Sequence, residues 1–393
     1  MVASRTKFYP VPSVDSCRTL PQMTIRVISI VVALLVTVKV AHGEALARVQ
    51  GSPQSLATLG EDLWRDRGKL IRGIEHNLLF LSSNAGQDAY HRAHSAGVEL
   101  QRVQLSLSRL LDLLIVSENP HELGLQIERE FQLYRSRGSD GDGRVVFTGY
   151  FQPRFRASRV RTQEFRFPIY QVPQDFKYWS KPHPSRVALE GYDGQGIDSS
   201  PALGAEMAWL SQRYDVFMIH LQGSAQLEFT DGTVQSVGFA AGTDYPFRGI
   251  SQNFLDHHQV AWQNLPSFFE RRPQLLDEVL SRNNRFIFFK RYGGGQPLGS
   301  IGVPVIPERS IATDKDCLPP GAIGLINASL PQRAESGSLV LRPTMRIVLD
   351  QDTGSAIRGP GRVDIFMGSG EEARKMANMV YTSGSLYYLL LKA

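Results

Sequence analysis

Apolar residues recur at helical spacing in the N-terminal part of the chain, from Ser52 to about Gly138. The clearest stripe follows the i, i+3, i+4, i+7 rhythm of one helix face, with Leu100, Val103, Leu107, Leu110, Leu111 and Leu114. The flanking stretches Leu63–Leu81 and Pro120–Arg137 predict companion helices, and Glu118-Asn119-Pro120 marks a break with proline at a helix start. We interpret this region as a helical segment whose leucines pack a core, not as a cofactor site.

After Gly143 the pattern changes to short runs of β-type residues separated by Gly, Pro, Asp and Asn. These runs predict strands at Val145–Tyr150, Phe165–Tyr170, Val216–Gln222, Gln226–Phe229, Thr233–Gly238 and Arg285–Lys290. Between two of them, Asp231-Gly232 predicts a tight hairpin, because this pair readily adopts the positive φ angles of such a turn. The middle of the chain is therefore expected to be mainly β.

The C-terminal part alternates again between helical and β patterns. A helical stretch is expected from Gly249 to about Leu280, and a Gly-rich β region from Gly293 to Asp350. The order Ser369-Gly370-Glu371-Glu372 fits a capping box, in which a serine hydroxyl and a glutamate satisfy free N–H groups at a helix start. This motif predicts a short helix at Ala373–Val380, and Leu386–Leu391 predicts the last strand.

The N-terminus carries an almost continuously apolar segment, Val27–Val40, preceded by Arg26 and followed by the small-residue pattern Ala41-His42-Gly43. This arrangement predicts a signal peptide over residues 1–43, cleaved after Gly43, or a short N-terminal anchor if it is not cleaved. Met23 is a possible alternative start. We expect an exported protein of the periplasm or cell envelope that can associate with a membrane through its N-terminus.

Composition narrows the classes of partner and cofactor. At 393 residues the chain can form two domains. Its formal net charge of +5 favours anionic partners such as a cell-wall polymer or a membrane surface, while no run of Lys or Arg indicates nucleic acid. Two cysteines, Cys17 and Cys317, and nine histidines without ligand spacing predict no disulfide, no metal site and no cofactor.

Candidate chemistry is concentrated near the C-terminus. Asp352 and Asp364 lie about a dozen residues apart, each beside apolar strand-type residues and glycines that let a substrate come close. Val363, Ile365 and Phe366 surround Asp364 with apolar side chains, an environment that raises the pKa of an aspartate and keeps it partly protonated near neutral pH. This is the setting that a catalytic acid needs.

Several separate motifs resemble those of the membrane-bound lytic murein transglycosylase A (MltA) family, in the same order. The resemblance covers about residues 144–391. It rests on Phe147-Thr148-Gly149-Tyr150-Phe151-Gln152-Pro153, Phe167-Pro168-Ile169-Tyr170, Leu221-Gln222-Gly223-Ser224, Tyr245-Pro246-Phe247-Arg248-Gly249-Ile250, Pro319-Pro320-Gly321 and the block from Asp352 to Asp364.

The resemblance implies a mainly β (β-rich α+β) fold with two domains. A double-psi β-barrel domain would be built from residues 44–151, which include the helical segment, and from residues 290–393, which carry the catalytic part. A second small β-barrel domain, residues 152–289, would be inserted between them. Members of the family bind a peptidoglycan glycan strand in the groove between these domains.

The family reaction needs only one catalytic acid. Members cleave the β-1,4 bond between N-acetylmuramic acid and N-acetylglucosamine, and the C6 hydroxyl of the muramic acid attacks its own anomeric carbon to leave a 1,6-anhydro ring. One carboxyl group can protonate the leaving oxygen and then accept the hydroxyl proton. By resemblance the catalytic aspartate falls on Asp364, and the earlier aspartate, which supports the transition state, falls on Asp352.

The same motifs supply the candidate substrate-binding residues. These are Thr148, Gly149, Tyr150, Gln222, Gly223, Ser224, Gly354 and Ala356. Tyr150 and Phe151 could stack on sugar rings, and residues 222–224 could offer hydrogen bonds to N-acetyl groups. Asp244, Tyr245 and Arg248 are weaker candidates, because Arg248 could simply pair with a structural carboxylate.

The chain departs from the family pattern at three positions. Gln152 stands where members often have glutamate, Ala225 follows Ser224 where glycine is usual, and Ser355 replaces a second glycine.

Two other classes of protein remain as alternatives. Asp352-Thr353-Gly354-Ser355 is also the signature of pepsin-like proteases, which need two such loops, but the chain has a single copy. A non-catalytic polysaccharide-binding or wall-loosening double-psi barrel would keep the groove without needing an acid at Asp364.

Overall fold

The computed structural model describes residues 45–49, 59–92, 97–293 and 296–392. The predicted signal peptide or anchor of residues 1–43, with Met23 and Cys17, lies outside these ranges. Among the helices that they contain, none has the length and apolar character required to cross a bilayer.

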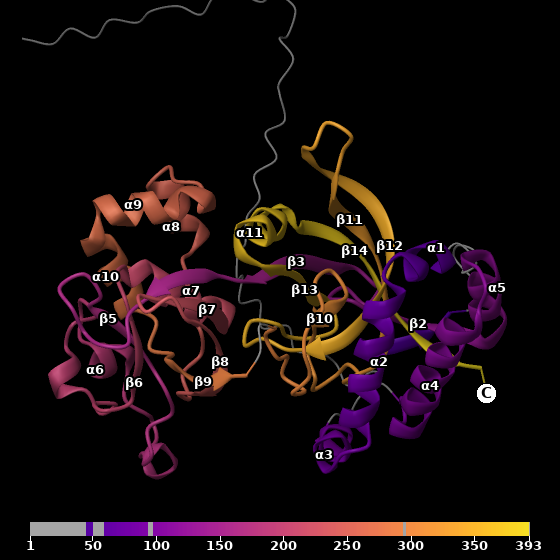
Figure 1. Ribbon diagram of the computed structural model, residues 1–393, viewed down its shortest axis with the longest axis horizontal. Helices are drawn as coiled ribbons and strands as arrows, with labels where there is room; N and C mark the ends of the chain where they lie inside the picture. Colours follow the sequence, from indigo (N-terminus) through magenta and orange to yellow (C-terminus); the bar gives the residue numbers. More distant parts are fainter. Residues whose placement is uncertain (1–44, 50–58, 93–96, 294–295, 393) are drawn as a thin grey trace, which may run out of the picture.

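A closed six-stranded β-barrel forms the centre of the molecule (Figure 1). Its strands are β3 (Val145–Gln152), β10 (Ser310–Ala312), β11 (Ile323–Arg333), β12 (Leu339–Asp352), β13 (Arg362–Ser369) and β14 (Tyr381–Leu391). The order is β14-β11-β12-β10-β13-β3, and β14 pairs with β3 to close the ring. Two of the pairs are parallel, β10 with β12 and β13 with β3. The prediction of a mainly β protein is confirmed.

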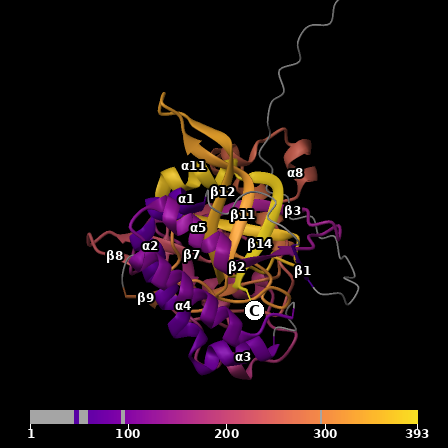
Figure 2. The same cartoon turned by 90° about the vertical axis from the view of Figure 1, so that its right-hand side faces the viewer.

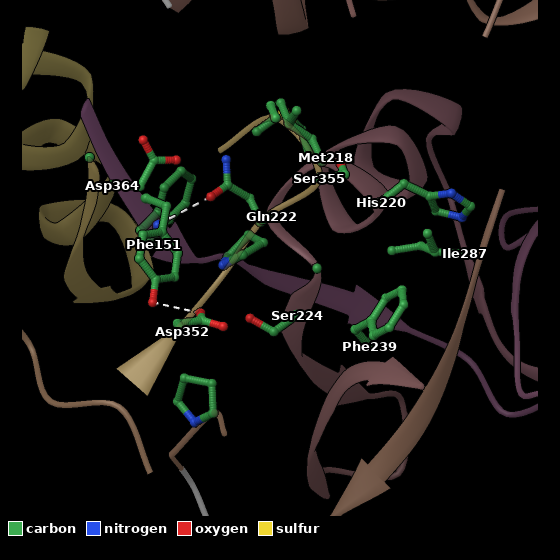
Figure 3. Close-up of a pocket in the computed structure, with 18 of the residues that line it drawn as sticks. Phe151, Met218, His220, Gln222, Ser224, Phe239, Ile287, Asp352, Ser355 and Asp364 are labelled. Atoms are coloured by element: carbon green, nitrogen blue, oxygen red, sulfur yellow. Dashed lines mark hydrogen bonds between the residues drawn. The ribbon is translucent and has the colours of Figure 1, made fainter. Parts of the chain in front are cut away.

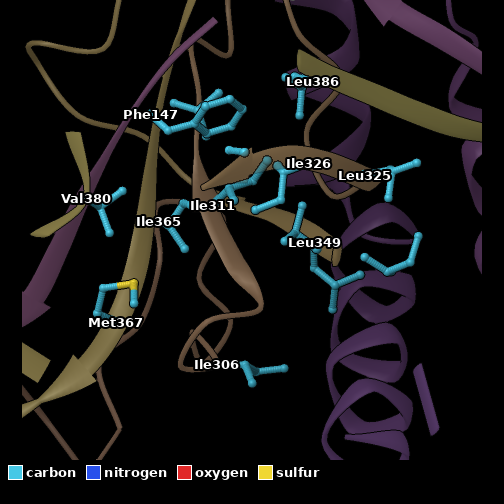
Figure 4. Close-up of a cluster of buried hydrophobic side chains, with 14 of the residues drawn as sticks. Phe147, Ile306, Ile311, Leu325, Ile326, Leu349, Ile365, Met367, Val380 and Leu386 are labelled. Atoms are coloured by element: carbon cyan, nitrogen blue, oxygen red, sulfur yellow. The ribbon is translucent and has the colours of Figure 1, made fainter. Parts of the chain in front are cut away.

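Alternation along the barrel strands fills the core and leaves polar groups on the opposite face. Ile365 of β13 is fully buried beside Ile311 of β10 and Leu349 of β12 (Figure 4). Because successive side chains of a strand point to opposite faces, Asp364 is directed away from this core. Each fully buried aliphatic side chain stabilises the fold by about 1.5–3 kcal/mol, so the strand position of Asp364 is firmly held.

The N-terminal helices cover one side of the barrel, as Figure 2 shows from that side. They are α1 (Leu59–Arg65), α2 (Arg67–Leu81), α3 (Asn84–Arg92), α4 (Leu100–Val116) and α5 (Pro120–Glu130). In the predicted leucine stripe, Val103, Leu107, Leu110 and Leu114 are buried and the other two are partly buried. Asn119 caps α5 by accepting a hydrogen bond from the Glu122 backbone N–H.

The prediction of a helix from Pro120 to Arg137 is wrong at its C-terminal end. The helix ends at Glu130, and Phe131–Ser136 forms the strand β2, which pairs with β14. A short β1 (Leu46–Arg48) adds to the outer side of β2. The alternating burial of Phe131 and Leu133 suits a strand, and β14 offers it a partner that sequence periodicity does not reveal.

A second body, on the left of Figure 1, is formed by residues between β3 and β10. Its strands are β4 (Arg154–Ala157), β5 (Phe167–Tyr170), β6 (Glu206–Leu210), β7 (Ser224–Phe229), β8 (Val234–Gly242) and β9 (Ile287–Tyr292). They form a four-stranded sheet, β4-β7-β8-β9, and a two-stranded sheet, β5-β6. Single bridges, Gln171 with Phe289 and Ser158 with Trp209, connect the two sheets. The predicted hairpin joins β7 to β8, with Gly232 at a φ of +82°.

Short helices complete this body. They are α6 (Arg186–Glu190), α7 (Arg213–Gln222), α8 (Gln252–His257), α9 (Leu265–Arg271), α10 (Pro273–Ser281) and the 3-10 turns at Phe176–Tyr178, Ile197–Ser199 and Trp262–Asn264. The last three α-helices and the turn at Trp262 occupy the predicted helical stretch.

Two sequence expectations in this half of the chain are wrong. Val216–Gln222 belongs to α7, not to a strand; its side chains from Val216 to His220 are all buried, and a short run of that kind does not distinguish helix from strand. The capping box is also absent at α11 (Gly370–Met379). The Ser369 hydroxyl makes no hydrogen bond to the helix N–H groups and donates instead to Gln152 Oε1 of β3 at 2.8 Å.

Arg309 joins the helical layer to the barrel. Its side chain has no exposed surface and donates to Asp62 at 2.5 Å and to Asp66 at 2.9 Å. Asp62 also accepts from the Ile347 backbone N–H of β12 at 3.1 Å. This network anchors the start of the helical layer on the strand that ends at Asp352.

We predict that Arg309→Met lowers the free energy of unfolding by about 3 kcal/mol, because two carboxylates lose their buried cation. Urea unfolding followed by circular dichroism measures the change. Arg342→Met, which replaces an exposed arginine of β12, is the matched control and should stay within about 0.5 kcal/mol of wild type. Equal losses in the two variants would contradict the anchoring role of Arg309.

Candidate active site

A cleft of about 1400 Å³ opens between the barrel and the second body. Its walls come from β3, β9, α7, α11, β13 and the loop that follows β12 (Figure 3). All the predicted catalytic and substrate-binding residues line it, namely Thr148, Gly149, Tyr150, Gln222, Gly223, Ser224, Asp352, Gly354, Ala356 and Asp364. The structure therefore brings together residues that are more than 200 positions apart in the sequence.

Strand register sets the relation between the two aspartates. Ala312 of β10 is the register partner of Asp352 on one side and of Asp364 on the other. The aspartates thus lie on strands two apart at one level of the barrel, about 9–10 Å apart at the backbone from the usual strand spacing.

Asp364 is the less constrained of the two carboxyl groups. Its side chain is 23% exposed, and Oδ1 lies 3.5 Å from Arg362 Nε without a hydrogen bond. Burial raises the pKa of Asp364, the positive charge of Arg362 lowers it, and the charge of Asp352 raises it further, with a net upward direction. A group in this state can release and take up a proton without breaking a hydrogen-bond network.

Asp352 is held by three hydrogen bonds. Its Oδ2 accepts from the Tyr150 hydroxyl at 2.8 Å, and its Oδ1 accepts from the backbone N–H groups of Ser300 at 2.9 Å and Thr353 at 2.8 Å. Burial raises the pKa of Asp352, and these hydrogen bonds lower it because they favour the charged form, with a net upward direction. The donors fix the carboxylate in one orientation.

Tyr150 contacts both Asp352 and Phe366, a residue of the strand that carries Asp364. Its hydroxyl donates to Asp352, and its ring lies 5.2 Å from the ring of Phe366, the residue two positions after Asp364. Burial raises the pKa of Tyr150 well above its usual value, so the phenol stays a donor. Phe151 is only 4% exposed and belongs to the buried core, but it also lines the cleft, so stacking of its ring on a sugar stays a prediction.

Thr148 and Gly149 line the cleft but also have structural contacts. The Thr148 hydroxyl, 1% exposed, accepts a hydrogen bond from Arg362 Nη2 at 3.2 Å and so orients that guanidinium. A Cβ atom on Gly149 would lie 2.7 Å from the Ala377 Cα of α11, which explains why glycine is required there. Both residues help to place the groups around Asp364.

The turn from α7 into β7 forms the opposite wall. Gln222 Oε1 accepts from the Phe151 backbone N–H at 3.2 Å, as Figure 3 shows. Gly223 ends the helix at a φ of +74°, a left-handed conformation that suits glycine. Ser224 follows as the first residue of β7 and faces the cleft with its hydroxyl.

The loop after Asp352 carries the remaining predicted residues. The Thr353 hydroxyl donates to the Thr313 carbonyl at 2.8 Å and fixes the start of the loop. Gly354 accepts from the Ile357 backbone N–H at 3.0 Å, which forms a turn, and Ala356 is exposed at its tip. Both residues line the cleft.

Three weaker candidates lie elsewhere. Asp244 pairs with His183 at 2.9 Å, and the Tyr245 hydroxyl donates to the His183 carbonyl at 2.7 Å. These two residues and Arg248 do not line the cleft. Gln152, one of the three positions at which the sequence departs from the resembled pattern, is fully buried. Within the described ranges, no three His, Cys, Asp or Glu side chains are grouped to hold a metal ion.

Sequence reasoning missed the charged residues of the cleft. Besides the two aspartates, the lining includes Arg154, Arg186, Asp215, Arg285, Lys290, Arg358, Arg362, Glu371 and Arg374. Arg362 could have been found, since it lies two positions before Asp364 on one strand and therefore on the same face. Asp215, in the first turn of α7, has its pKa raised to about 7 by burial. No local pattern indicated the others.

Comparison with protein families finds two matches. Residues 146–290 match the model described as the MltA specific insert domain, and residues 309–390 match the 3D domain. Together they cover more than half of the chain. The chain is 27% identical over 263 residues to membrane-bound lytic murein transglycosylase A of Escherichia coli K12, covering 65% of this chain and 68% of that protein. A homologue from Buchnera aphidicola is 24% identical over 267 residues, covering 66% and 69%.

Solved structures show the same fold. The crystal structure of a membrane-bound lytic murein transglycosylase from Agrobacterium tumefaciens has a TM-score of 0.67 and 26% identity, covering 88% of this chain and 98% of that one. Escherichia coli MltA with bound chitohexaose has a TM-score of 0.62 and 23% identity, covering 89% and 95%.

We predict that Tyr150→Phe raises the pKa of Asp352, because the phenol hydrogen bond that favours the charged form is lost. Carboxyl carbon NMR across a pH series measures the shift. Tyr214→Phe removes a hydroxyl from another ring of the cleft, one that does not interact with Asp352, and should leave this pKa unchanged. An unchanged pKa of Asp352 in the Tyr150→Phe variant would exclude the role of Tyr150 in holding the Asp352 carboxylate.

Proposed function

We propose that this chain, which belongs to the MltA family, is a lytic murein transglycosylase that cleaves the β-1,4 bond between N-acetylmuramic acid and N-acetylglucosamine with formation of a 1,6-anhydromuramic acid end. The family matches and the names of the relatives support peptidoglycan as the substrate. The observation that carries the proposal is the half-buried carboxyl group of Asp364, with one oxygen free of hydrogen bonds, in a cleft of about 1400 Å³.

Bond cleavage begins with proton transfer from Asp364. The protonated carboxyl group donates its proton to the glycosidic oxygen as the bond to the anomeric carbon breaks, and the N-acetylglucosamine side leaves as an alcohol. The raised pKa of Asp364 increases the fraction that carries this proton near neutral pH. The muramic acid side then bears developing positive charge at its anomeric carbon and ring oxygen.

Ring closure returns the proton to the enzyme. The C6 hydroxyl of the same muramic acid forms the new bond to the anomeric carbon, and the Asp364 carboxylate accepts its proton. Asp352, held by Tyr150 and two backbone N–H groups, provides a fixed negative charge that stabilises the oxocarbenium-like transition state. Asp364 has then regained its proton and is ready for another cycle. No water is consumed.

The finer fold and domain assignments belong to this proposal. Residues 44–151 and 290–393 would build a double-psi barrel, which the parallel β3–β13 and β10–β12 pairs support. Residues 152–289 would form the inserted second barrel, which the single bridges between its two sheets support. Glycan would lie between them against Thr148, Gly149, Tyr150, Gln222, Gly223, Ser224, Gly354 and Ala356.

The place of action would be the cell envelope. The N-terminal apolar segment favours export to the periplasm, with membrane association if the segment is retained. The names of the relatives, membrane-bound transglycosylases, agree with this location.

We expect purified protein to release muropeptides that are lighter than the hydrolytic products by the mass of one water molecule. Mass spectrometry of digested peptidoglycan measures this mass difference directly.

Asp364→Asn keeps the size of the side chain but cannot cycle a proton, so turnover should fall at least ~10²-fold. Wild-type products with the mass of hydrolysed muropeptides would indicate a hydrolase. Tight glycan binding with no cleavage would favour the alternative, a non-catalytic polysaccharide-binding barrel.

We also predict that Arg362→Gln moves the alkaline limb of the kcat/KM profile to higher pH. Activity needs protonated Asp364 and declines as pH rises through its pKa. Arg362 lowers that pKa, so removal of its charge raises it. Arg374→Gln removes another positive charge from the cleft, one that pairs with Glu371 and does not shift Asp364, and should leave the limb in place. A limb that moves to lower pH in the Arg362 variant would contradict the acid role.

A further inference from the structure

The lining of the cleft contains one aromatic ring that is largely uncovered. Phe239 of β8 is 46% exposed, more than any other aromatic residue of the lining. Within the described part of the chain, no second aromatic ring stacks on it and no Lys or Arg lies over it. An uncovered apolar ring on the wall of a cleft is available to a ligand.

The end of α7 explains why this ring is uncovered. Phe239 shares one face of the sheet with its register partner on β9, Phe289, which is only 1% exposed. On that face Phe289 packs in one cluster with Val216 and Ile219 of α7. The helix ends immediately before Gly223, whose carbonyl accepts from the Phe239 backbone N–H at 2.8 Å. Phe239 therefore lies just beyond the helix that covers its neighbours.

The backbone holds Phe239 in place. Besides the hydrogen bond to Gly223, a β-bulge fixes the strand, since the register of β8 with β9 shifts between Phe239 and Ala241 and leaves Ala240 as the extra residue. Bulges redirect side chains and are frequent beside active sites. A ring on a fixed strand loses little conformational freedom when a ligand binds, which favours binding.

The surroundings of Phe239 suit an uncharged ligand. Figure 3 shows its ring beside Ile287 of β9, on the opposite side of the pocket from Asp364. Ile287 also lines the cleft, so the two side chains form an apolar strip on the wall of the second body. Apolar walls of this kind bind the apolar parts of a ligand, whereas polar groups elsewhere in the site orient it.

We propose that Phe239 is the stacking platform for one N-acetylhexosamine ring of the glycan strand. The inference rests on the proposed function, which places such a strand in the cleft. One face of a pyranose ring carries C–H groups, and it stacks on an aromatic ring through dispersion and the burial of apolar surface. Because Phe239 and Asp364 lie on opposite sides of the pocket, this sugar is not the one whose bond breaks.

Phe239 therefore contributes to binding and not to the chemical step. A contact that is equally strong before and at the transition state lowers KM without changing kcat. Phe239→Leu keeps an apolar side chain but removes the ring, so it should raise KM for solubilised glycan strands about tenfold. Its kcat should stay within about twofold of wild type.

The test measures Kd by calorimetry in the full-length Asp364→Asn protein, which binds without turnover. Three probes are used: chitohexaose, a hexasaccharide of alternating N-acetylglucosamine and N-acetylmuramic acid, and the same hexasaccharide with stem peptides. Phe239→Leu should weaken binding of all three about tenfold, whereas Phe239→Trp, which keeps a platform, should bind within about twofold of the parent. Tyr192→Leu replaces a 54% exposed aromatic residue of the second body outside the cleft lining, and this matched control should change nothing.

The pattern of losses decides what Phe239 contacts. A loss confined to the stem-bearing hexasaccharide would assign Phe239 to the peptide and overturn the platform. Unchanged binding of chitohexaose by the Phe239→Leu variant, an equal loss in Phe239→Trp, or a lower kcat with an unchanged KM would overturn it as well. Failure of the proposed function appears separately, as an absence of anhydro products from the wild-type protein, and leaves the comparison of Kd values intact.

Discussion

The hydrogen-bond register of β10 with its two neighbours is the constraint on which the site depends. Ala312 pairs with Asp352 on one strand and with Asp364 on the other, so both carboxyl groups lie at one level of the barrel. A shift of one residue in either strand would turn its aspartate into the core. Closure of the ring through β14 and β3 prevents such a shift, because no barrel strand is left with a free edge along which to move.

Hydrogen bonding then gives the two aspartates different properties. Both are shielded from water, which raises both pKa values, but Asp352 accepts three hydrogen bonds while Asp364 has one loose ion pair. The first is therefore fixed in orientation, and the second is free to exchange a proton. Arg362, oriented by Thr148, adjusts the proton affinity of Asp364 from the same strand.

The cleft exists because two bodies are held at its sides. The helical N-terminal layer, anchored by Arg309 on Asp62 and Asp66, supports the outer face of the barrel. The second body brings α7 and the residues around β9 to the opposite wall. Charged residues that are far apart in the chain, such as Arg285 and Arg358, line one cleft only in this arrangement.

The sequence by itself determined the mainly β pattern, the leucine stripe of α4, the Asp-Gly hairpin and the apolar surroundings of Asp364, because each depends on neighbours in the chain. Only the tertiary structure decided that Val216–Gln222 belongs to a helix, that Phe131–Ser136 pairs with β14, and that the Ser369 hydroxyl bonds Gln152. It also decided which charged residues line the cleft. Such outcomes depend on the groups that packing brings within hydrogen-bonding or Coulombic range, and sequence spacing does not encode those distances.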